Sequence, residues 1–317
     1  MGASAYGHLP SMTNATSPRA SAIRWQYEIP AIGGIVVGFD GSPASHAAIE
    51  TAAVIAAARK CAVHVMSVLR PMSSYQIDLK VDQPRSEVDD LRVQLREAAL
   101  RDAIGQREER ANWTRQVATG NPAPKITETA ERMGADLIIV GRSQRGVIDR
   151  MLAGETTLQV MRLSPVPVLV VGEEMKQPEI VVAAVDFGPA SMRAAALGLE
   201  MLNGTGTLYL VHVDEPVEAF PDCFVLPEPP YSSAQLVELL RQRADVLGVP
   251  PGVVVEPVAL SGRPSRAVAE FCDRVGADLL VAGTHGLSRI ARFLVGSVST
   301  GLVRLVHKPV IIVPAKD

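Results

Sequence analysis

The sequence predicts an α/β protein made of two tandem domains, each a five-stranded parallel sheet with helices on both faces. Short apolar segments alternate with amphipathic stretches along most of the chain, which is the pattern of parallel strands joined by crossover helices. This pattern occurs twice, and 317 residues is the usual length of about two domains.

Matching motifs show that the two halves are copies of one another. Three short motifs of the first half return in the second, each pair 142 residues apart. Near the start of each half, Asp40 and Asp186 end similar apolar segments 146 residues apart, as small loop differences would produce. A nearly constant offset over this length indicates an internal repeat. The pairs are Gly134–Leu137 with Gly276–Leu279, Gly120-x-Pro122 with Gly262-x-Pro264, and Pro167-Val168 with Pro309-Val310.

Each half is expected to hold five buried strands, because its apolar segments are short and nearly continuous. In the first half they are predicted at Ile35–Phe39, Ala62–Val68, Trp113–Ala118, Asp136–Val140 and Val166–Val171. In the second half they are predicted at Ile180–Val185, Thr207–Val213, Val253–Ala259, Asp278–Ala282 and Val310–Val313.

Prolines and polar residues mark the starts of the helices. The first helix of each half is expected near Pro43 or Pro189, since proline is tolerated in a first turn. The next helix of the first half opens at Ser86, with Asp89 in a position similar to a capping box. Its counterpart follows the Pro-rich loop Glu215–Pro230. Apolar residues at helical spacing predict the buried faces, Val88, Leu91, Leu95 and Ala98 in the first half and Leu236, Leu239, Leu240 and Val246 in the second.

Composition sets the domain limits and excludes some functions. Residues 1–30, rich in Ser, Ala, Thr, Pro and Gly, predict a disordered tail, with a transit peptide as the alternative. Domains are then expected at 31–173 and 178–317. A net charge of −3 argues against a nucleic-acid partner, and no apolar run is long enough to span a membrane. Cys61, Cys223 and Cys272 form no metal-binding or disulfide spacing, which favours a reducing, cytoplasmic location.

A glycine-spaced segment near the C-terminus carries the clearest chemical signal. Gly283 and Gly286 follow the strand Asp278–Ala282, and Gly296-Ser297 comes nine residues after Gly286. Glycines allow a close approach of the backbone, and the start of a helix adds partial positive charge. Together these features predict a phosphate site and therefore a nucleotide.

Asp186 and Val213 are expected at the same edge of the sheet as Gly283. Ligands of open parallel sheets bind outside the carboxyl ends of the strands, where the strand order reverses. Asp186 has two interpretations, a bond to a nucleotide or a cap for the next helix. His285, between two glycines, lies either beside phosphate or in a solvated loop.

The spacing Gly-x2-Gly-x9-Gly-[Ser/Thr] resembles the ATP-binding signature of the universal stress proteins. The resemblance extends over residues 33 to 315 and includes Val185–Phe187, Val211–Val213 and the closing Lys-Pro-Val-Ile-Ile-Val. It implies Rossmann-like (adenine nucleotide alpha hydrolase-like) domains with strand order 3-2-1-4-5. It also implies that ATP is bound, its adenosine end near Asp186 and Val213. The implied binding residues are Ala184, Val185, Asp186, Val213, Ala282, Gly283, His285, Gly286, Gly296, Ser297, Val298 and Ser299.

The first half departs from this signature. Gly141 and Gly154 keep their places, and Asp40 and Val68 hold the positions of the adenosine end. Gln144, however, replaces the second glycine, and Glu155 replaces the Ser/Thr at the expected helix start. A carboxylate there would repel phosphate and occupy its donors. We therefore expect weak or no ATP binding, although Gly146 could restore the turn. Three arginines supply nearby positive charge or belong to a solvated loop: Arg142, Arg145 and Arg150.

The resulting hypothesis is a non-catalytic, ATP-binding sensor or regulator of a stress response, with a divalent ion such as Mg²⁺ held through the phosphates. No protein residue is expected to bind a metal directly. The resemblance implies that the last strands, Val166–Val171 and Val310–Val313, join the halves as an internal pseudo-dimer, and a homodimer of chains stays open. The alternatives are slow ATP hydrolysis or autophosphorylation at Ser297 or Ser299, and a nucleotide-independent module that binds a regulatory protein.

Overall fold

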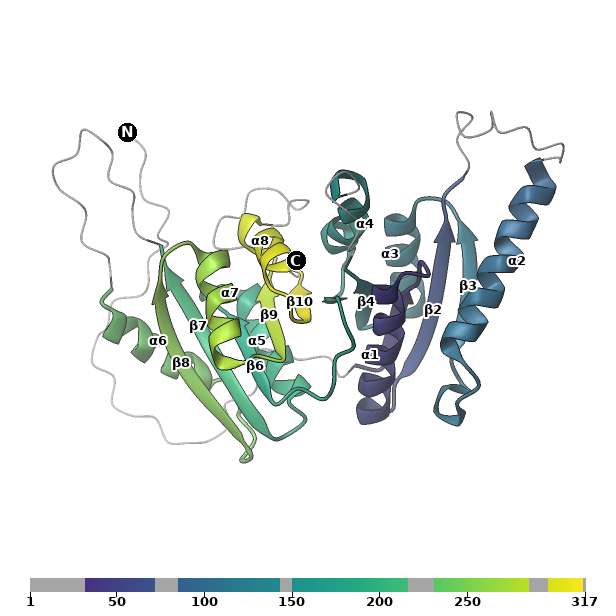
Figure 1. The fold of residues 1–317 in the computed structure, drawn as a ribbon. Coiled ribbons are helices and arrows are strands. Elements are labelled where there is room, and N and C mark those ends of the chain that lie inside the picture. The colour runs from purple at the N-terminus through teal and green to yellow at the C-terminus, as the bar shows by residue number, and fades with distance from the viewer. Residues whose placement is uncertain (1–31, 72–84, 143–149, 216–230, 285–295, 316–317) are drawn as a thin grey trace, which may run out of the picture.

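The computed structural model describes residues 32–71, 85–142, 150–215, 231–284 and 296–315 (Figure 1). The expected N-terminal tail, most of the Pro-rich loop and Cys223 lie outside these ranges. The described part contains an α/β fold in which helices cover a long twisted sheet.

Ten strands form one continuous sheet in the order β3-β2-β1-β4-β5-β10-β9-β6-β7-β8. Each half therefore has the expected order 3-2-1-4-5, and all of its own strand pairs are parallel. The strands of the first half are β1 (Gly34–Gly38), β2 (Ala62–Leu69), β3 (Thr114–Thr119), β4 (Leu137–Gly141) and β5 (Val168–Val171). Those of the second half are β6 (Ile180–Ala184), β7 (Gly206–Asp214), β8 (Val253–Ser261), β9 (Leu279–Gly283) and β10 (Val310–Val313).

The last strands of the two halves join the sheets. β5 and β10 pair antiparallel, with Val310 opposite Val170 and Ile312 opposite Val168. Both strands are buried along their whole length. The expected association of the halves as a pseudo-dimer is confirmed, and the two five-stranded sheets are corrected to one sheet of ten strands.

Two apolar cores lie on opposite faces of this sheet, and each extends through both halves. One core joins Ile49 and Leu169 of the first half to Met192 and Ile311 of the second. The helices on this face are α1 (Pro43–Arg59), α2 (Arg85–Ile104), α5 (Pro189–Met201) and α6 (Ser233–Asp245). The other face carries α3 (Pro122–Met133), α4 (Arg150–Leu163), α7 (Pro264–Val275) and α8 (Ser297–Leu305).

The helix starts follow the local sequence. α1 begins at Pro43, where the Ser42 side chain accepts a hydrogen bond from the Ser45 amide, and α5 begins at Pro189, as expected. A capping box between Ser232 and Gln235 opens α6. The expected apolar face of α6 is buried at Leu236 and Leu240 and half-buried at Leu239 and Val246.

The predicted buried face of α2 is wrong. Leu91 and Leu95 are 50% and 62% exposed, Ala98 is exposed and Val88 half-buried, whereas Leu100 and Ile104 are buried. α2 has 20 residues, about 30 Å of helix, whereas the six residues of β3 span about 20 Å. The N-terminal part of α2 therefore reaches beyond the sheet (Figure 1), and only its last turns contribute to the core.

The segment between the halves is held by polar contacts. The Met175 amide donates to Thr51 Oγ1 of α1 at 3.0 Å, and Gln177 Nε2 donates to the Met201 carbonyl of α5 at 2.7 Å. On the same face, Arg59 Nη1 and Glu200 Oε2 form an ion pair at 2.8 Å between α1 and α5. The two halves are thus tied along the linker as well as through the sheet.

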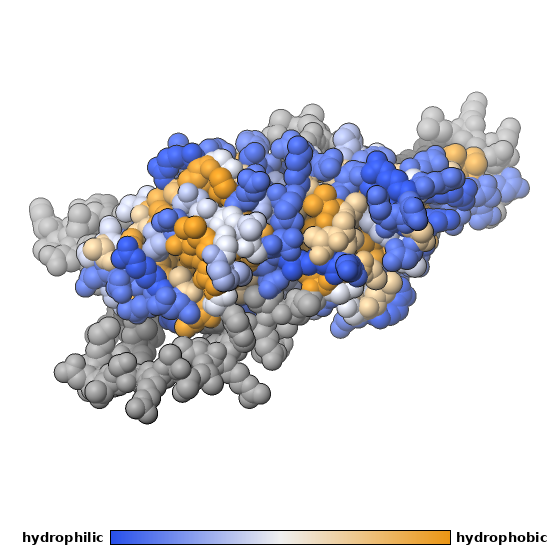
Figure 2. All heavy atoms as spheres, turned by 90° about the horizontal axis from the view of Figure 1, so that it is seen from below, coloured by the Kyte–Doolittle hydropathy of each residue, from blue (hydrophilic) through white to orange (hydrophobic). Residues whose placement is uncertain are grey.

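The surface seen from below shows small apolar areas separated by hydrophilic residues (Figure 2). Among the described residues, no helix is both long and apolar enough to cross a membrane.

Candidate functional site

The carboxyl ends of β6, β7 and β9 bring several predicted site residues together. Ala184, the last residue of β6, lies opposite Val211 of β7 and Ala282 of β9. The Val185 amide extends this ladder with a 2.8 Å hydrogen bond to the Val211 carbonyl. Val213 and Gly283 complete the same edge. His285 and Gly286 lie outside the described residues.

The Asp186 carboxylate accepts hydrogen bonds from groups at the start of α5. Its Oδ1 atom accepts hydrogen bonds from the Gly188 amide at 2.9 Å and from Ser191 Oγ at 2.6 Å. The carboxylate therefore orders the turn into α5, but it does not cap this helix as the sequence suggested, because the N-cap residue is Gly188. Both contacts use Oδ1, so they leave Oδ2 for a further donor.

The first glycine of the signature has a structural role in both halves. A Cβ atom on Gly283 would lie 2.8 Å from the Ser191 amide nitrogen of α5. On Gly141 it would lie 2.7 Å from the Ser45 amide nitrogen of α1. Distances below 3.0 Å to backbone are too short for a real Cβ. Gly141 thus keeps its packing function whether or not the first half binds a nucleotide.

The start of α8 has the properties of an anion site. Gly296 is the N-cap residue and makes no side-chain capping bond, and the first turn contains no acidic residue. Its amide donates to the Thr284 carbonyl at 2.9 Å, and a Cβ there would lie 2.9 Å from that oxygen. The first intrahelical bond runs from the Thr300 amide to the Gly296 carbonyl. The amides of Ser297, Val298 and Ser299 therefore precede it, at the positive end of the helix dipole.

Ser297 and Ser299 differ in exposure. Ser297 and Val298 are exposed, whereas Ser299 is buried. Ser299 Oγ donates to the Gly283 carbonyl at 2.8 Å and also lies 3.3 Å from the Thr284 carbonyl. This side chain fastens the start of α8 to the end of β9. In the first half, Thr157 Oγ1 makes the corresponding bond to the Gly141 carbonyl at 3.3 Å.

In the first half the helix begins earlier relative to the signature. α4 starts at Arg150, so Gly154 and Glu155 lie inside the helix, not at its start as the sequence suggested. Only the first four amides of an α-helix lack intrahelical partners. Amides from Gly154 onward are therefore used within α4. Gln144, Arg145 and Gly146 lie outside the described residues.

In the first half, the Arg70 side chain bridges the carboxyl end of β2 and α4. Arg70, just after β2, donates from Nη2 to Thr156 Oγ1 of α4 at 3.1 Å. The Arg70 carbonyl accepts from Arg92 Nη2 of α2 at 3.0 Å. Val68 is half-buried, and Asp40 Oδ1 accepts from the Ser42 amide at 2.9 Å. The sequence analysis did not predict the Arg70 bridge. Aligning the two halves could have drawn attention to it, because Glu215 and Val298 take the places of Arg70 and Thr156 in the second half.

Arg142 does not lie in a solvated loop, which is one of the two interpretations offered for it. Its guanidinium donates to the carbonyls of Val306 and Lys308 across the β5–β10 junction. Burial lowers the pKa of this arginine, while the charge of Glu173 acts in the opposite direction.

The two described cysteines have no features of redox sites. Cys61 and Cys272 are buried free thiols. Burial raises the pKa of both, for Cys272 to about 12. The reactive thiolate is therefore scarce at neutral pH.

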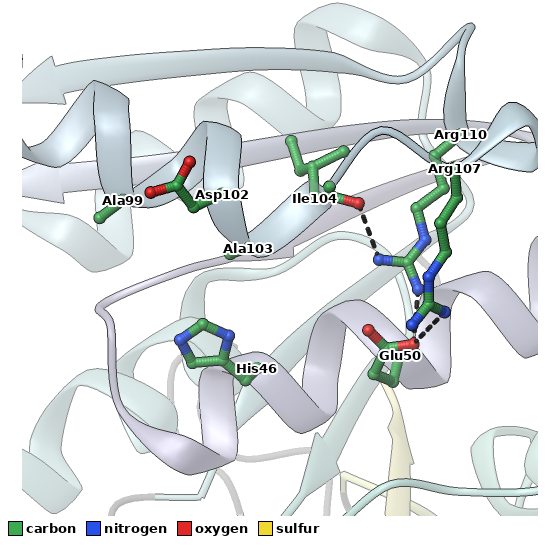
Figure 3. Close-up of a pocket in the computed structure, with 9 residues that line it drawn as sticks. His46, Glu50, Ala99, Asp102, Ala103, Ile104, Arg107 and Arg110 are labelled. Carbon is green, nitrogen blue, oxygen red and sulfur yellow. Dashed lines mark hydrogen bonds and ion pairs between the residues drawn. The ribbon is translucent and has the colours of Figure 1, made fainter.

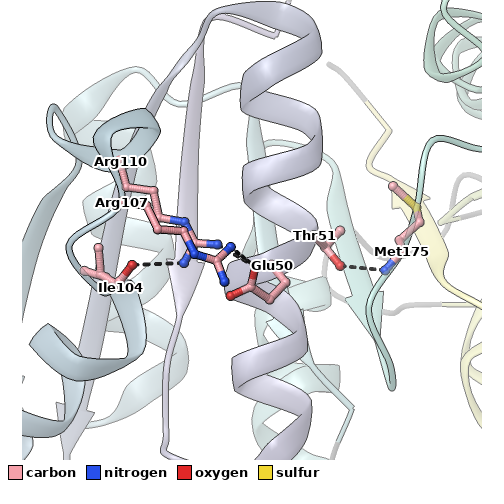
Figure 4. A network of polar contacts seen from close by, with 6 residues as sticks. All are labelled: Glu50, Thr51, Ile104, Arg107, Arg110 and Met175. Atoms are coloured by element: carbon pink, nitrogen blue, oxygen red, sulfur yellow. Dashed lines mark hydrogen bonds and ion pairs between the residues drawn. The ribbon is translucent and has the colours of Figure 1, made fainter.

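A separate cavity of about 450 Å³ lies between α1, the end of α2 and the short helix η2 (Glu108–Arg110) (Figure 3). Arg107 and Arg110 both contact Glu50 Oε2, at 3.2 and 2.5 Å, and Arg110 also donates to the Ile104 carbonyl. Figure 4 shows this network next to the Thr51–Met175 contact. The two arginines pair with the carboxylate within the first half, so the network ties α1 to the segment after α2.

Strand order 3-2-1-4-5, with helices on both faces and a glycine at the end of the fourth strand, defines each half as a Rossmann-like α/β domain. The sequence profile described as "Universal stress protein family" matches residues 33–172 and 178–314, and the chain belongs to this family. The resemblance seen in the sequence is thereby confirmed.

The chain is similar to several family members over most of its length. It is 27% identical over 310 residues to a universal stress protein of Mycobacterium tuberculosis (strain CDC 1551 / Oshkosh), covering 88% of this chain and 94% of the relative. A second relative, from Mycobacterium tuberculosis (strain ATCC 25618 / H37Rv), is 27% identical over 297 residues, covering 88% and 96%. The crystal structure of a universal stress protein from Archaeoglobus fulgidus DSM 4304 matches with a TM-score of 0.67 and 18% identity, covering 90% and 97%. This last likeness supports the fold.

Proposed function

We propose that the second half binds ATP at the carboxyl edge of β6, β7 and β9, and that the protein acts as a non-catalytic sensor or regulator in a stress response. One observation carries the proposal. The N-cap residue of α8 is a glycine beside the end of β9, no side chain caps the helix, and its first turn has exposed residues and no acidic group. Such a helix start favours a phosphate group.

The residues present fit an adenine nucleotide. The amides of Ser297 and Val298 would face the phosphates, and Gly296 leaves them accessible because it has no side chain. Ala184, Asp186 and Val213 would hold the adenosine end, with Asp186 Oδ2 as an acceptor for a hydroxyl or an amino group. Among the described residues, no group of three or more His, Cys, Asp or Glu side chains could hold a metal. A divalent ion would therefore bind through the phosphates.

The described side chains at this edge favour binding over catalysis. Ser299 donates its hydroxyl proton to main-chain carbonyls, which cannot take it up as a base. Asp186 uses Oδ1 for Ser191 and Gly188, and its Oδ2 is assigned to the adenosine end of the ligand. A nucleophilic hydroxyl needs a base that accepts its proton, and a general base must lie within reach of the reacting group. Autophosphorylation, the first alternative, would fall on the exposed Ser297 and not on Ser299.

Nucleotide content and calorimetry test the proposal together. The freshly purified protein is expected to carry ATP, and the stripped protein to bind it with one site per chain. A Gly286→Gln, Ser297→Glu double variant, which copies the first half, should lose both. A matched control, Glu155→Ser in the first half, should leave the stoichiometry unchanged. No ATP binding by the wild type would contradict the proposal and favour the protein-interaction module, and radiolabel transfer from ATP that is lost in Ser297→Ala would favour the enzyme.

A further inference from the structure

The turns that follow α4 and α8 are copies, but their carbonyl groups are satisfied differently. After α4, Ser164 Oγ donates to the Val166 carbonyl at 2.6 Å, so this turn provides its own donor. After α8, Val306 stands in the place of Ser164 and has no hydroxyl group. The backbone carbonyl of Lys308, the counterpart of Val166, accepts instead from Arg142 Nη2 at 2.9 Å. The second turn therefore depends on a side chain from the other half.

Arg142 is positioned for this role by the sheet. It follows Gly141 at the end of β4, and its amide donates to the Val171 carbonyl at 2.6 Å. From there its guanidinium crosses the β5–β10 junction to the carbonyls of Val306 and Lys308. Its Nε atom is buried and has no hydrogen-bond partner in the described part of the chain. The side chain is thus half-buried and directed at one place.

The counterpart of Arg142 behaves differently. Thr284 follows Gly283 in the second half, and its hydroxyl accepts a hydrogen bond from the Ala315 amide at 3.1 Å. A threonine is too short to reach across the junction. Within the described residues, this contact therefore runs from the degenerate signature of the first half to the second half.

The residues that Arg142 contacts end the helix of the candidate phosphate site. Val306 is the C-cap residue of α8, and its amide donates to the Leu302 carbonyl at 2.9 Å. α8 has nine residues, about 14 Å of helix, with the phosphate-facing amides at its other end. A cation at a helix C-terminus is favourable, and arginine keeps its charge in proteins.

We propose that Arg142 is a positioning residue for the nucleotide site of the other half: it holds the carboxyl end of α8, so that the amino end of α8 stays in place for phosphate. This inference rests on the proposed ATP site. It assigns the first half a function in that site, since a residue of its altered signature supports the intact copy.

Titration calorimetry of the full chain with two probes, ATP and adenosine, tests the inference. Arg142→Thr, which copies Thr284, is expected to weaken ATP binding about fivefold to tenfold, at the low end of typical couplings between sites. Adenosine has no phosphate for α8, so its affinity should change less than about twofold. Arg142→Lys should restore part of the ATP affinity, because an ammonium still donates to a carbonyl at the helix end.

Arg59→Ala is the matched control, since it removes another contact between the halves, on the α1–α5 side of the sheet and away from α8. It should leave the ratio of ATP to adenosine affinity unchanged. An unchanged ratio in Arg142→Thr, or equal losses for both ligands, would overturn the inference and leave the ATP site standing. If the wild type binds no ATP, the proposed function itself fails. Should Arg142→Thr not fold, the ratio of ATP to adenosine affinity in Arg142→Lys decides. A ratio below that of the wild type supports the inference, and an unchanged ratio overturns it.

Discussion

The two halves share strand order and helix placement, but differ where a nucleotide would bind. In the second half α8 begins at Ser297, next to the end of β9. In the first half α4 begins at Arg150, so the equivalent amides lie inside the helix, and Arg70 bridges the edge to Thr156. The change at Glu155 is therefore accompanied by a change in the backbone. The two halves thus differ in where this helix begins, while the glycine needed for packing is retained in both.

The largest expected effect concerns that shared glycine. Gly141→Val and Gly283→Val should each destabilise the fold by about 3 kcal/mol or more, because the side chain would overlap the backbone of α1 or α5. Denaturant unfolding measures both. If Gly141 were a mere remnant of a lost site, its variant would unfold like the wild type, and only Gly283→Val would be unstable.

A charge at the start of α8 should have the next largest effect. Ser297→Glu is expected to weaken ATP binding on the order of 100-fold or more, because a like charge beside phosphate costs several kcal/mol. Folding should be unaffected, since an acidic residue suits a helix N-terminus. Calorimetry with ATP on Ser297→Glu and on Glu155→Ser compares the same position in the two halves. ATP binding gained by Glu155→Ser would show that charge alone, not helix extension, closed the first half.

A pH dependence of stability is expected from His64 in the first half. His64 is buried, with Nδ1 2.8 Å from Thr114 Oγ1, and burial, with the charge of Arg132, lowers its pKa. The unfolded state therefore takes up the proton first, so stability is complete above about pH 6.5 and falls as the pH decreases. In the second half the position belongs to Tyr209, so no histidine occupies it. Melting temperatures between pH 7.5 and 5.5 should decrease less in His64→Gln than in the wild type, and equal slopes would contradict this.

The smallest effect is expected at the bridge of the first half. Arg70→Glu, which copies Glu215, removes an exposed hydrogen bond and should cost about 0.5 to 1 kcal/mol. It should not create an ATP site, even combined with Glu155→Ser, because the amides stay inside α4. ATP binding to that double variant, detected as a second site in calorimetry, would show that the bridge was the barrier.

Much of the fold could be predicted because it depends on local patterns. Apolar runs and the repeat gave the ten strands, and Pro43 and Pro189 gave two helix starts. The buried face of α2 could not be predicted, because apolar spacing does not reveal that Leu91 and Leu95 lie beyond the end of the sheet. The predicted site residues that are described lie at one edge, and their part in ligand binding stays a prediction.

The sequence by itself determined that the chain is a duplicated α/β protein and which half carries the intact signature, because strand periodicity and glycine spacing are properties of short segments. Only the tertiary structure decided that the two sheets are continuous, that Ser299 is used for packing, and that Arg142 reaches Val306 and Lys308. These contacts join residues up to 166 positions apart. The antiparallel pairing of β5 with β10 brings these residues together, and the pattern of a short segment does not contain this information.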